Sequence, residues 1–355
     1  MEIKKKILTD PKRGNIPSSA NLSFGVHFSD HMFVMKYNKE KEWHDAQIIP
    51  YENFSMDPAA TCFHYGQAIF EGLKAYRGKD GKIRLFRPME NMERFNRSAW
   101  RMCMPMVDKQ FLSESIKELV RIDSSWVPAN RGTSLYIRPF MIATEAFLGV
   151  RPAHEYLLSV ITCPVGAYYK EGFDPVKIYV TDKYVRSVKG CVGEAKAAGN
   201  YGASLMASEE AKELGFTQVL WLDAMEKRYV EEVGTMNIFF IFNNTLVTPE
   251  LSGSILHGIT RDSVLRIAKR WGMEVEVRKV PVMEVLQKAK TGELKECFGT
   301  GTAAVISPVG SLFHKGKNYV VNGGETGAIA LRLFDEITGI QYGEREDVYG
   351  WTEVI

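Results

Sequence analysis

The sequence predicts a mixed α+β protein made of two domains. Its 355 residues, 45% of them hydrophobic, can form two sizeable cores, because one domain typically takes ~150 residues. Short apolar runs of strand length alternate with longer segments of helical spacing. The apolar pattern breaks between residues 168 and 174. We therefore predict a smaller N-terminal domain over 1–169, a linker over 170–181 and a larger C-terminal domain over 182–355.

The first half of the chain contains both kinds of element. Between residues 33 and 76, short apolar runs alternate with turn signals, as strands do. A strand is predicted over 83–86, and the spacing of Met92, Phe95 and Ala99 predicts a helix after Pro88. Further predictions are a helix over 111–122 and strands over 134–142 and 156–161.

The second half repeats this mixture. Gly215 should end a helix over 204–214, since glycine suits a helix C-terminus. The apolar run 218–222 predicts a buried strand, and 237–248 predicts a hairpin turning at Asn243 and Asn244. Thr260 is predicted to cap a helix, and a closing helix over 329–337 follows two glycines.

Charge and cysteine usage exclude several classes of protein. The 45 Lys and Arg against 43 Asp and Glu leave a net charge of +2, far from the basic surface that nucleic-acid binding requires. We find no signal peptide and no run of ~18 apolar residues, so we expect a cytoplasmic location and no membrane association. The five cysteines and seven histidines show no metal-ligand spacing, and we assign no metal.

Lys196 is the first candidate for chemistry. It is a lone basic residue among small neighbours in the sequence GEAKAAGNYG. Small residues let the backbone or a cofactor approach closely. A lysine amine is a nucleophile only when unprotonated, so it needs a crowded, partly dry site with positive potential nearby. The alternative is an ordinary solvated lysine, as most lysines are.

Other segments could hold a phosphate beside that lysine. The start of the helix near Thr260, the loop over 299–302 and Arg94 offer N–H groups, hydroxyls and a guanidinium. No nucleotide-binding glycine motif is present, which favours a smaller phosphorylated cofactor. Pyridoxal phosphate requires one lysine, a phosphate site and an acid for its ring nitrogen. Glu232 is the candidate acid, and Tyr201 could donate to the phenolic oxygen of the cofactor.

Several motifs of the sequence resemble those of the branched-chain amino acid aminotransferases, which are fold-type IV pyridoxal-phosphate enzymes. The resemblance covers nearly the whole chain. It is carried by FSDHM at 28–32, HYGQAIFEGLKAY at 64–76, KAAGNYG at 196–202, EVGTMN at 232–237 and GTA at 301–303. It implies a two-domain fold with the cofactor between the domains. It also implies transfer of an amino group from leucine, isoleucine or valine to 2-oxoglutarate by a reversible, ping-pong route.

The resemblance implies a role for each matching residue. Lys196 would form the Schiff base and move the proton during the reaction, Glu232 would hold the ring nitrogen, and Tyr201 would hold the phenolic oxygen. The phosphate would be bound by Arg94, Ile259, Thr260 and Thr302, with Arg186 close by. The substrate would contact Phe24, Tyr65, Phe70, Lys74, Tyr136, Arg138, Tyr168, Thr302 and Ala303, with Arg138 binding the distal carboxylate of glutamate.

Two rival functions stay open, and a homodimer is expected. A lyase or D-amino-acid transaminase of the same fold would share Lys196 and Glu232, but it is not expected to keep the segments around Phe70 and Tyr136 in this register. A non-catalytic module that binds a phosphorylated ligand would use Lys196 only structurally. The family resemblance implies small-molecule substrates and a homodimer with sites near the subunit interface.

Overall fold

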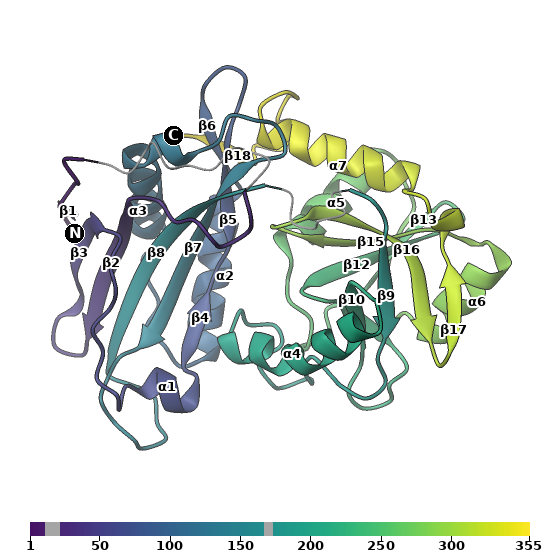
Figure 1. Ribbon diagram of the computed structural model, residues 1–355, viewed down its shortest axis with the longest axis horizontal. Coiled ribbons are helices and arrows are strands. Elements are labelled where there is room, and N and C mark those ends of the chain that lie inside the picture. Colours follow the sequence, from purple (N-terminus) through teal and green to yellow (C-terminus); the bar gives the residue numbers. More distant parts are fainter. Residues whose placement is uncertain (11–21, 167–172) are drawn as a thin grey trace. The chain divides into compact units, whose positions relative to one another are not determined.

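The computed structural model describes residues 1–10, 22–166 and 173–355. The chain forms two compact units. Unit 1 comprises Met1–Tyr168, Ala195–Gly199 and Gly339–Ile355, and unit 2 comprises Tyr169–Glu194 and Asn200–Thr338. Each unit combines a large sheet with helices (Figure 1). The α+β class predicted from the sequence is therefore confirmed.

Unit 1 is built on one nine-stranded sheet. Its strand order is β1-β3-β2-β8-β7-β5-β6-β18, and β4 also pairs with β7. The strands are β1 (Lys4–Lys5), β2 (His31–Asn38), β3 (Glu42–Pro50), β4 (Ala68–Phe70), β5 (Leu73–Arg77), β6 (Ile83–Phe86), β7 (Ser134–Ala143), β8 (Glu155–Val165) and β18 (Thr352–Val354). The helices are α1 (Thr61–Tyr65), α2 (Pro88–Arg101), α3 (Lys109–Ile122) and the short η3 (Ser124–Trp126).

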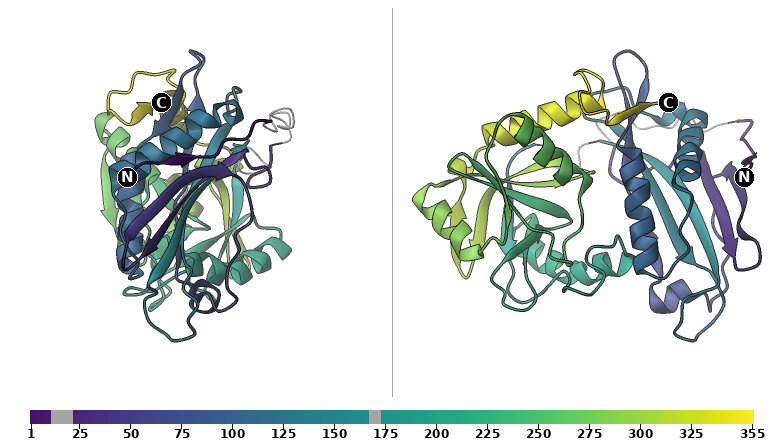
Figure 2. Two further views of the ribbon diagram at one scale, coloured as in Figure 1. Left: turned by 90° about the vertical axis from the view of Figure 1, so that its left-hand side faces the viewer. Right: turned by 180° about the vertical axis from the view of Figure 1, so that it is seen from behind.

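Helices α2 and α3 pack on one face of this sheet (Figure 2). Met92 and Phe95 of α2, together with Leu112 and Ile116 of α3, are fully buried in the same core as Leu85 of β6. Pro88 occupies the first position of α2, where its missing N–H costs nothing. The side chain of Asp108 accepts a hydrogen bond from the Phe111 N–H and thereby caps α3. The helices predicted after Pro88 and over 111–122 are confirmed.

Unit 2 contains a sheet that closes on itself. Its order is β11-β10-β9-β16-β15-β12-β13-β14, and an additional pairing of β11 with β12 joins the ring. The strands are β9 (Val176–Val180), β10 (Gln218–Leu222), β11 (Val230–Val233), β12 (Met236–Phe242), β13 (Thr245–Pro249), β14 (Val275–Arg278), β15 (Leu294–Gly301), β16 (Val305–His314) and β17 (Lys317–Val320). The other elements are α5 (Ile259–Arg270), α6 (Val282–Thr291) and the short η4 (Asn322–Gly324).

Two helices contain residues assigned to both units, namely α4 (Ala198–Glu213) and α7 (Ala328–Gln341). Gly215 follows α4 with a φ of +84°, a left-handed conformation that favours glycine. The strand predicted over 218–222 and the hairpin of β12 and β13 are confirmed. Of the two hairpin asparagines, Asn243 adopts a positive φ of 52°.

The structure departs from the sequence-based predictions at three places. Residues 176–180 of the predicted linker form β9, which lies between β10 and β16 and pairs in parallel with both. Residues 170–172 of that linker lie outside the described residues. The predicted division puts Lys196 and the C-terminus in the second domain, whereas 195–199 and 339–355 group with unit 1. The cap of α5 is Gly258 rather than Thr260, which lies inside the first turn without a capping bond.

Unit 1 also contains a buried polar link between sheet and helix. His31 Nδ1 lies 2.7 Å from Asp123 Oδ1, the His31 N–H donates to Asp123 Oδ2 at 3.0 Å, and the Leu8 N–H donates to His31 Nε2 at 3.0 Å. His31 and Asp123 are almost fully buried. This pair ties β2, the end of α3 and the N-terminal segment together.

Replacing Asp123 by asparagine should lower the free energy of unfolding of unit 1 by about 2–3 kcal/mol, since an amide NH2 would face a buried N–H donor. Urea denaturation measures the loss. The control is Glu93→Ala, which removes an exposed pair with Lys109 and should cost under ~1 kcal/mol. Equal losses in the two variants would show that the buried His31–Asp123 pair stabilises the protein no more than an exposed ion pair does.

Candidate active site

Lys196 is anchored to unit 1 through its backbone. Its N–H donates to Ser98 Oγ at 2.9 Å, and its carbonyl accepts from the Phe70 N–H at 3.1 Å. The next residue, Ala197, forms an antiparallel bridge with Ile69. The Lys196 Nζ atom lies 4.5 Å from the centroid of the Phe70 ring. The amine is thus fixed over an aromatic face, in a half-buried position.

A buried ion pair lies beside this lysine. Arg94 on α2 donates from Nε to Glu71 Oε1 at 2.7 Å and from Nη2 to Glu71 Oε2 at 2.9 Å. The Asn91 amide donates to Glu71 Oε2 at 2.8 Å. Burial by itself would raise the pKa of Glu71, but the charges of Arg94 and Lys196 and the hydrogen bonds from Arg94 and Asn91 hold it below its usual value.

A second group of side chains shares one face of the sheet, opposite to Glu71. Lys74 pairs with Tyr136 across β5 and β7, and Phe70 pairs with Phe140 across β4 and β7, so their side chains alternate with that of Glu71. Arg138 Nη2 donates to the Tyr136 hydroxyl at 3.0 Å, and the Arg138 guanidinium lies 4.6 Å from the Phe70 ring centroid. Aromatic and cationic groups therefore converge on this face.

Two further features shape that face. The Phe24 ring meets the Tyr136 ring edge-on, with centroids 4.8 Å apart. A Cβ atom on Gly72 would lie 2.0 Å from the Tyr136 hydroxyl oxygen, so only glycine leaves room for the tyrosine there. Within the described residues, Arg138 Nε is buried and has no hydrogen-bond partner. An anion would satisfy this donor.

Lys74 is buried on the same face. Burial lowers its pKa to about 8, and the neighbouring Cys163 opposes the shift. Lys74 therefore gains its positive charge as the pH falls through this value and is increasingly neutral above it. Its amine can add cationic character to a face that already carries Arg138.

Tyr65 and Tyr168 are the other two aromatic residues predicted to line the substrate pocket. Tyr65 ends α1, is exposed, and donates its hydroxyl to the Leu148 carbonyl. Tyr168 falls in the segment 167–172, outside the described residues. The structure brings Phe24, Phe70, Lys74, Tyr136 and Arg138 together on one face of unit 1.

In unit 2, Glu232 is the carboxylate with a fixed cationic partner. Arg186 Nε lies 2.9 Å from Glu232 Oε2, and both side chains are buried. The Leu256 N–H donates to Glu232 Oε1 at 2.7 Å. The neighbouring Glu231 differs, because burial, aided by the negative charges of Glu232 and Asp223, raises its pKa despite a hydrogen bond from Ser254. Of the two glutamates, Glu232 is thus the one paired with a guanidinium.

A row of polar side chains extends from Glu232 across the sheet. Glu232 pairs with Asn237 on β12, and Asn237 pairs with Thr300 on β15. Directly opposed residues of antiparallel strands share a face, so the three side chains point the same way. Asn237 Nδ2 donates to the Leu256 carbonyl at 2.9 Å. Thr300 Oγ1 is buried and, among the described residues, has no hydrogen-bond partner.

This row fixes the chain that leads into α5. Leu256 is held through its N–H by Glu232 and through its carbonyl by Asn237. A Cβ atom on Gly258 would lie 1.9 Å from Asn237 Oδ1, so the chain passes close to the row. Ile259 and Thr260 form the first turn of α5, whose N–H groups favour an anion.

The other predicted residues of unit 2 lie on different elements. Tyr201 is on α4, and Thr302 and Ala303 form the turn between β15 and β16. Arg186, which the sequence predicts near the phosphate, forms the ion pair with Glu232. Among the residues that the structure describes, no group of three or more His, Cys, Asp and Glu side chains could hold a metal ion.

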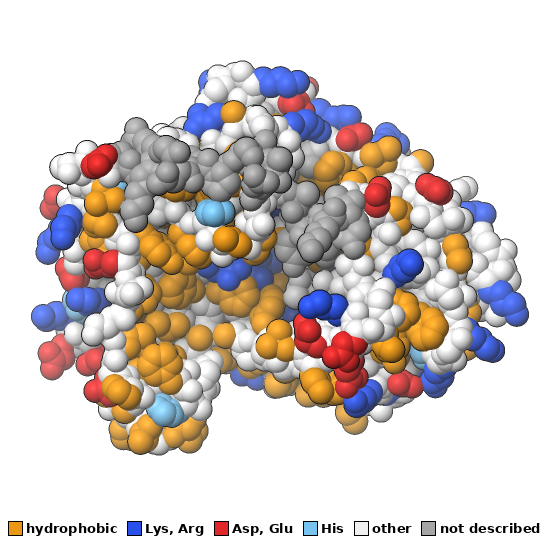
Figure 3. All heavy atoms as spheres, viewed as in Figure 1, with side chains coloured by type: hydrophobic (Ala, Val, Ile, Leu, Met, Phe, Trp, Pro, Cys, Tyr) orange, Lys and Arg blue, Asp and Glu red, His pale blue; other side chains and the backbone are white. Residues whose placement is uncertain are grey.

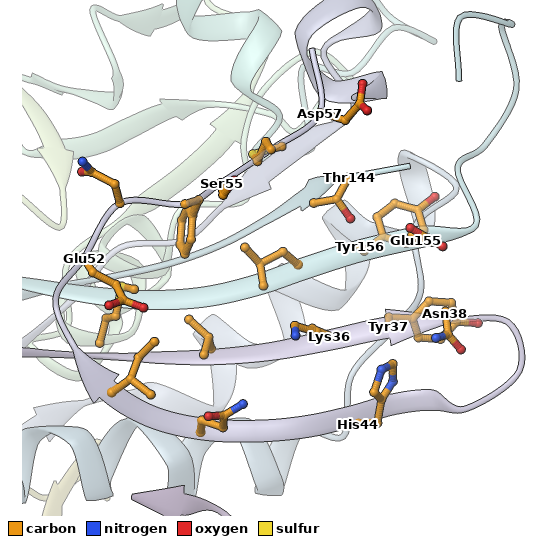
Figure 4. A pocket seen from close by; sticks show the side chains of 18 of the residues that line it. Lys36, Tyr37, Asn38, His44, Glu52, Ser55, Asp57, Thr144, Glu155 and Tyr156 are labelled. Carbon is orange, nitrogen blue, oxygen red and sulfur yellow. The ribbon is translucent and has the colours of Figure 1, made fainter. Parts of the chain in front are cut away.

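A groove of about 710 Å³ also lies on unit 1, over β2, β3, β8 and the segment 52–57 (Figure 4). Its lining includes Lys36, His44, Phe54 and Leu157, and it contains no residue that the sequence predicted for the site. Chemistry at Lys196 therefore does not take place in this groove.

Sequence reasoning missed the residues that hold the candidate site in place. Glu71, Asn91 and Ser98 support Arg94 and Lys196 in unit 1, and Asn237 supports the α5 approach in unit 2. Glu71 did carry a signal, because a carboxylate inside the apolar run AIFEGL requires a buried partner. Nothing local in the sequence identified that partner as Arg94.

The arrangement can hold an anion and a reactive amine. Within unit 1, the guanidinium of Arg94 and the Arg138 face are each suited to an anion. Within unit 2, the N–H groups of the first turn of α5 are suited to an anion, and Glu232 is suited to a cationic or N–H partner. Lys196 is the candidate nucleophile and proton carrier.

Comparison with known proteins gives one family. The sequence pattern of the amino-transferase class IV family matches residues 68–312. The branched-chain-amino-acid aminotransferase 2 of Bacillus subtilis is 56% identical over 345 residues, which are 97% of this chain and 95% of that protein. A branched-chain-amino-acid aminotransferase of Mycolicibacterium smegmatis is 49% identical, over 97% of this chain and 94% of the relative.

The solved structures that superpose on this chain include proteins of the same kind. The branched-chain amino acid aminotransferase of Escherichia coli superposes with a TM-score of 0.76 and 28% identity, over 91% of this chain and 98% of that chain. The branched-chain amino acid aminotransferase of T.th., solved with pyridoxamine 5'-phosphate, gives a TM-score of 0.75 and 30% identity, over 90% and 97% of the two chains. The chain therefore belongs to the class IV amino-transferase family, among the branched-chain-amino-acid aminotransferases.

Proposed function

We propose that this chain uses pyridoxal phosphate to transfer the amino group of L-leucine, L-isoleucine or L-valine to 2-oxoglutarate, giving the branched-chain 2-oxo acids and L-glutamate. The observation that carries the proposal is the anchoring of Lys196 over the Phe70 ring, beside the Glu71–Arg94 pair and the Arg138 face. The relatives named above, at 49–56% identity, support it.

The residues present fit this cofactor. Pyridoxal phosphate supplies an aldehyde that binds amines covalently and a ring that withdraws electrons. Lys196 offers the amine, and the buried guanidinium of Arg94 offers a partner for the phosphate. Glu232, held by Arg186 and Leu256, offers a carboxylate for the ring nitrogen, while the unpartnered Thr300 hydroxyl in the same row of the described structure can accept a further contact. We propose that these groups, with Tyr201, Ile259, Thr260 and Thr302, bind one cofactor molecule.

In this proposal each side chain has a distinct task. Lys196 Nζ would take up the proton from the substrate Cα and hold it for the return transfer. Tyr136, with the backbone at Thr302 and Ala303, orients the substrate α-carboxylate. Arg138 binds the second carboxylate of glutamate or 2-oxoglutarate, and Phe24 and Phe70 provide apolar contacts for the aliphatic side chains. Burial of the aliphatic side chain against these rings contributes a favourable binding free energy of ~25 cal/mol per Å² of buried apolar area.

The proposal extends to a cytoplasmic homodimer. Four large apolar side chains are exposed here: Phe63 and Tyr65 of α1, and Leu148 and Val150 of the loop between β7 and β8. Val150 is 85% exposed. The Phe147 N–H donates to the Ala59 carbonyl, so this loop lies against the start of α1, and Figure 3 shows apolar side chains gathered in that part of unit 1. Such a patch supports an interface with a second copy, and sedimentation as a monomer would contradict it. Within the described ranges, the longest apolar helices fall short of crossing a membrane.

Replacing Lys196 by alanine should abolish the yellow, borohydride-trappable cofactor and lower turnover at least ~10²–10⁴-fold, since the proton carrier is lost. Absorption spectra and a coupled assay with L-leucine and 2-oxoglutarate measure the two effects. Lys212→Ala, on the exposed side of α4, is the matched control and should behave as the wild type. Normal turnover by Lys196→Ala would refute the assignment.

Replacing Arg138 by methionine should separate the two kinds of substrate. The loss of one charge-assisted contact, about 1.5–3 kcal/mol, predicts a drop of about 10- to 100-fold in kcat/KM for 2-oxoglutarate. The half-reaction with L-leucine, which lacks a second carboxylate, should change far less. Stopped-flow measurement of each half-reaction tests this, and equal losses for both substrates would remove Arg138 from the carboxylate site. D-leucine in the same assay distinguishes the rival D-amino-acid transaminase.

A further inference from the structure

Glu71 is a charged residue on the core face of the unit 1 sheet. Its neighbours at alternate positions, Ile69, Leu73 and Ala75, are buried in the hydrophobic core beneath α2, and Glu71 itself is 0% exposed. Its N–H donates to the Pro139 carbonyl at 2.7 Å, which keeps the chain in register between β4 and β5. A lone carboxylate is costly in such a core, so Glu71 has a task that a hydrophobic residue cannot perform.

The contacts of Glu71 identify that task as holding Arg94. Both carboxylate oxygens accept bonds from the guanidinium, in a fork-to-fork arrangement that fixes its plane as well as its position. Asn91, one helical turn before Arg94, binds the same carboxylate. The side chain of Arg94 cannot turn without breaking two short, buried hydrogen bonds.

Ser98 extends this arrangement to Lys196. Its hydroxyl donates to the Arg94 carbonyl at 3.0 Å and accepts the Lys196 N–H at 2.9 Å. From the sheet side, Phe70, the residue before Glu71, binds the Lys196 carbonyl and lies under its amine. Glu71, Arg94 and Lys196 are therefore parts of one rigid set of contacts within unit 1.

We propose that Glu71 is a positioning residue for the transamination reaction: it orients Arg94 toward the cofactor phosphate and supplies the negative charge that stabilises a proton on the Lys196 nitrogen. The inference rests on the proposed function, in which Lys196 carries pyridoxal phosphate. The geometric support is the chain of contacts from Glu71 through Arg94 and Ser98 to the Lys196 backbone, and the charge of Lys196 is one of the causes that hold the pKa of Glu71 below its usual value.

The test is the pH titration of the visible absorption band of the loaded enzyme, which reports whether the nitrogen linking lysine to cofactor carries a proton. Glu71→Gln removes a negative charge from the contacts that link Arg94 to Lys196, while Arg94 keeps its positive charge, so the titration midpoint should fall by about one pH unit or more. Glu71→Asp keeps the negative charge, and its midpoint should stay within about 0.3 of the wild type.

Two further variants distinguish the effect of the Glu71 charge on the midpoint from an effect of the substitution on folding. The double variant Glu71→Gln with Arg94→Gln replaces the ion pair by two neutral amides, and its midpoint should return toward the wild type. If Glu71→Gln alone does not fold, the midpoint of Arg94→Gln compared with that of the double variant measures the same loss of the Glu71 charge, and it should again fall by about one unit. Asp123→Asn, which alters a buried carboxylate bonded to His31, should leave the midpoint unchanged.

The outcomes distinguish this inference from the proposed function. A midpoint that stays within about 0.3 of the wild type when the Glu71 charge is removed, or an equal shift in Asp123→Asn, overturns the role of Glu71 while the proposed function stands. A wild-type protein that shows no visible band with pyridoxal phosphate overturns the proposed function and the inference together.

Discussion

The buried ion pair between Glu71 and Arg94 is the interaction on which the rest of the candidate site in unit 1 depends. Taking a guanidinium out of water costs several kcal/mol unless a carboxylate with good geometry receives it. Glu71 provides that geometry through two hydrogen bonds of 2.7 and 2.9 Å. Because side chains alternate along a strand, placing Glu71 toward α2 puts Phe70 and Lys74 on the other face, beside Tyr136 and Arg138. The segment from β4 to β5 thus contacts α2 on one face and contributes Phe70 and Lys74 to the other.

In unit 2, a closed sheet positions the polar side chains. The pairing of β11 with β12 completes the ring and aligns Glu232, Asn237 and Thr300 across three strands. Two of these side chains hold Leu256 by its N–H and its carbonyl, and the start of α5 follows directly. The sheet therefore positions the backbone N–H groups that favour an anion, and Arg186 forms a buried ion pair with Glu232.

The sequence predicted those parts of the fold that depend on local periodicity. The helix after Pro88 and the strand over 218–222 follow from the spacing of their apolar residues. Strand β9 was placed in a linker, because its neighbours β10 and β16 are distant in sequence and supply the hydrogen bonds that define it. Lys196 was identified by its small neighbours and its family motif, whereas its grouping with unit 1 depends on bonds to Phe70 and Ser98 far away in the chain. Thr260 has the chemistry of a helix cap, yet the close approach to Asn237 makes Gly258 the capping residue.

The central claim is that Lys196 carries a cofactor that stores the amino group between two half-reactions. The most direct measurement is the amount of branched-chain 2-oxo acid released when the loaded enzyme is mixed with L-leucine and no amino acceptor. The account predicts about one equivalent of 2-oxo acid per chain, with loss of the yellow colour, and its return on addition of 2-oxoglutarate. Release of no 2-oxo acid until the acceptor is present would contradict it.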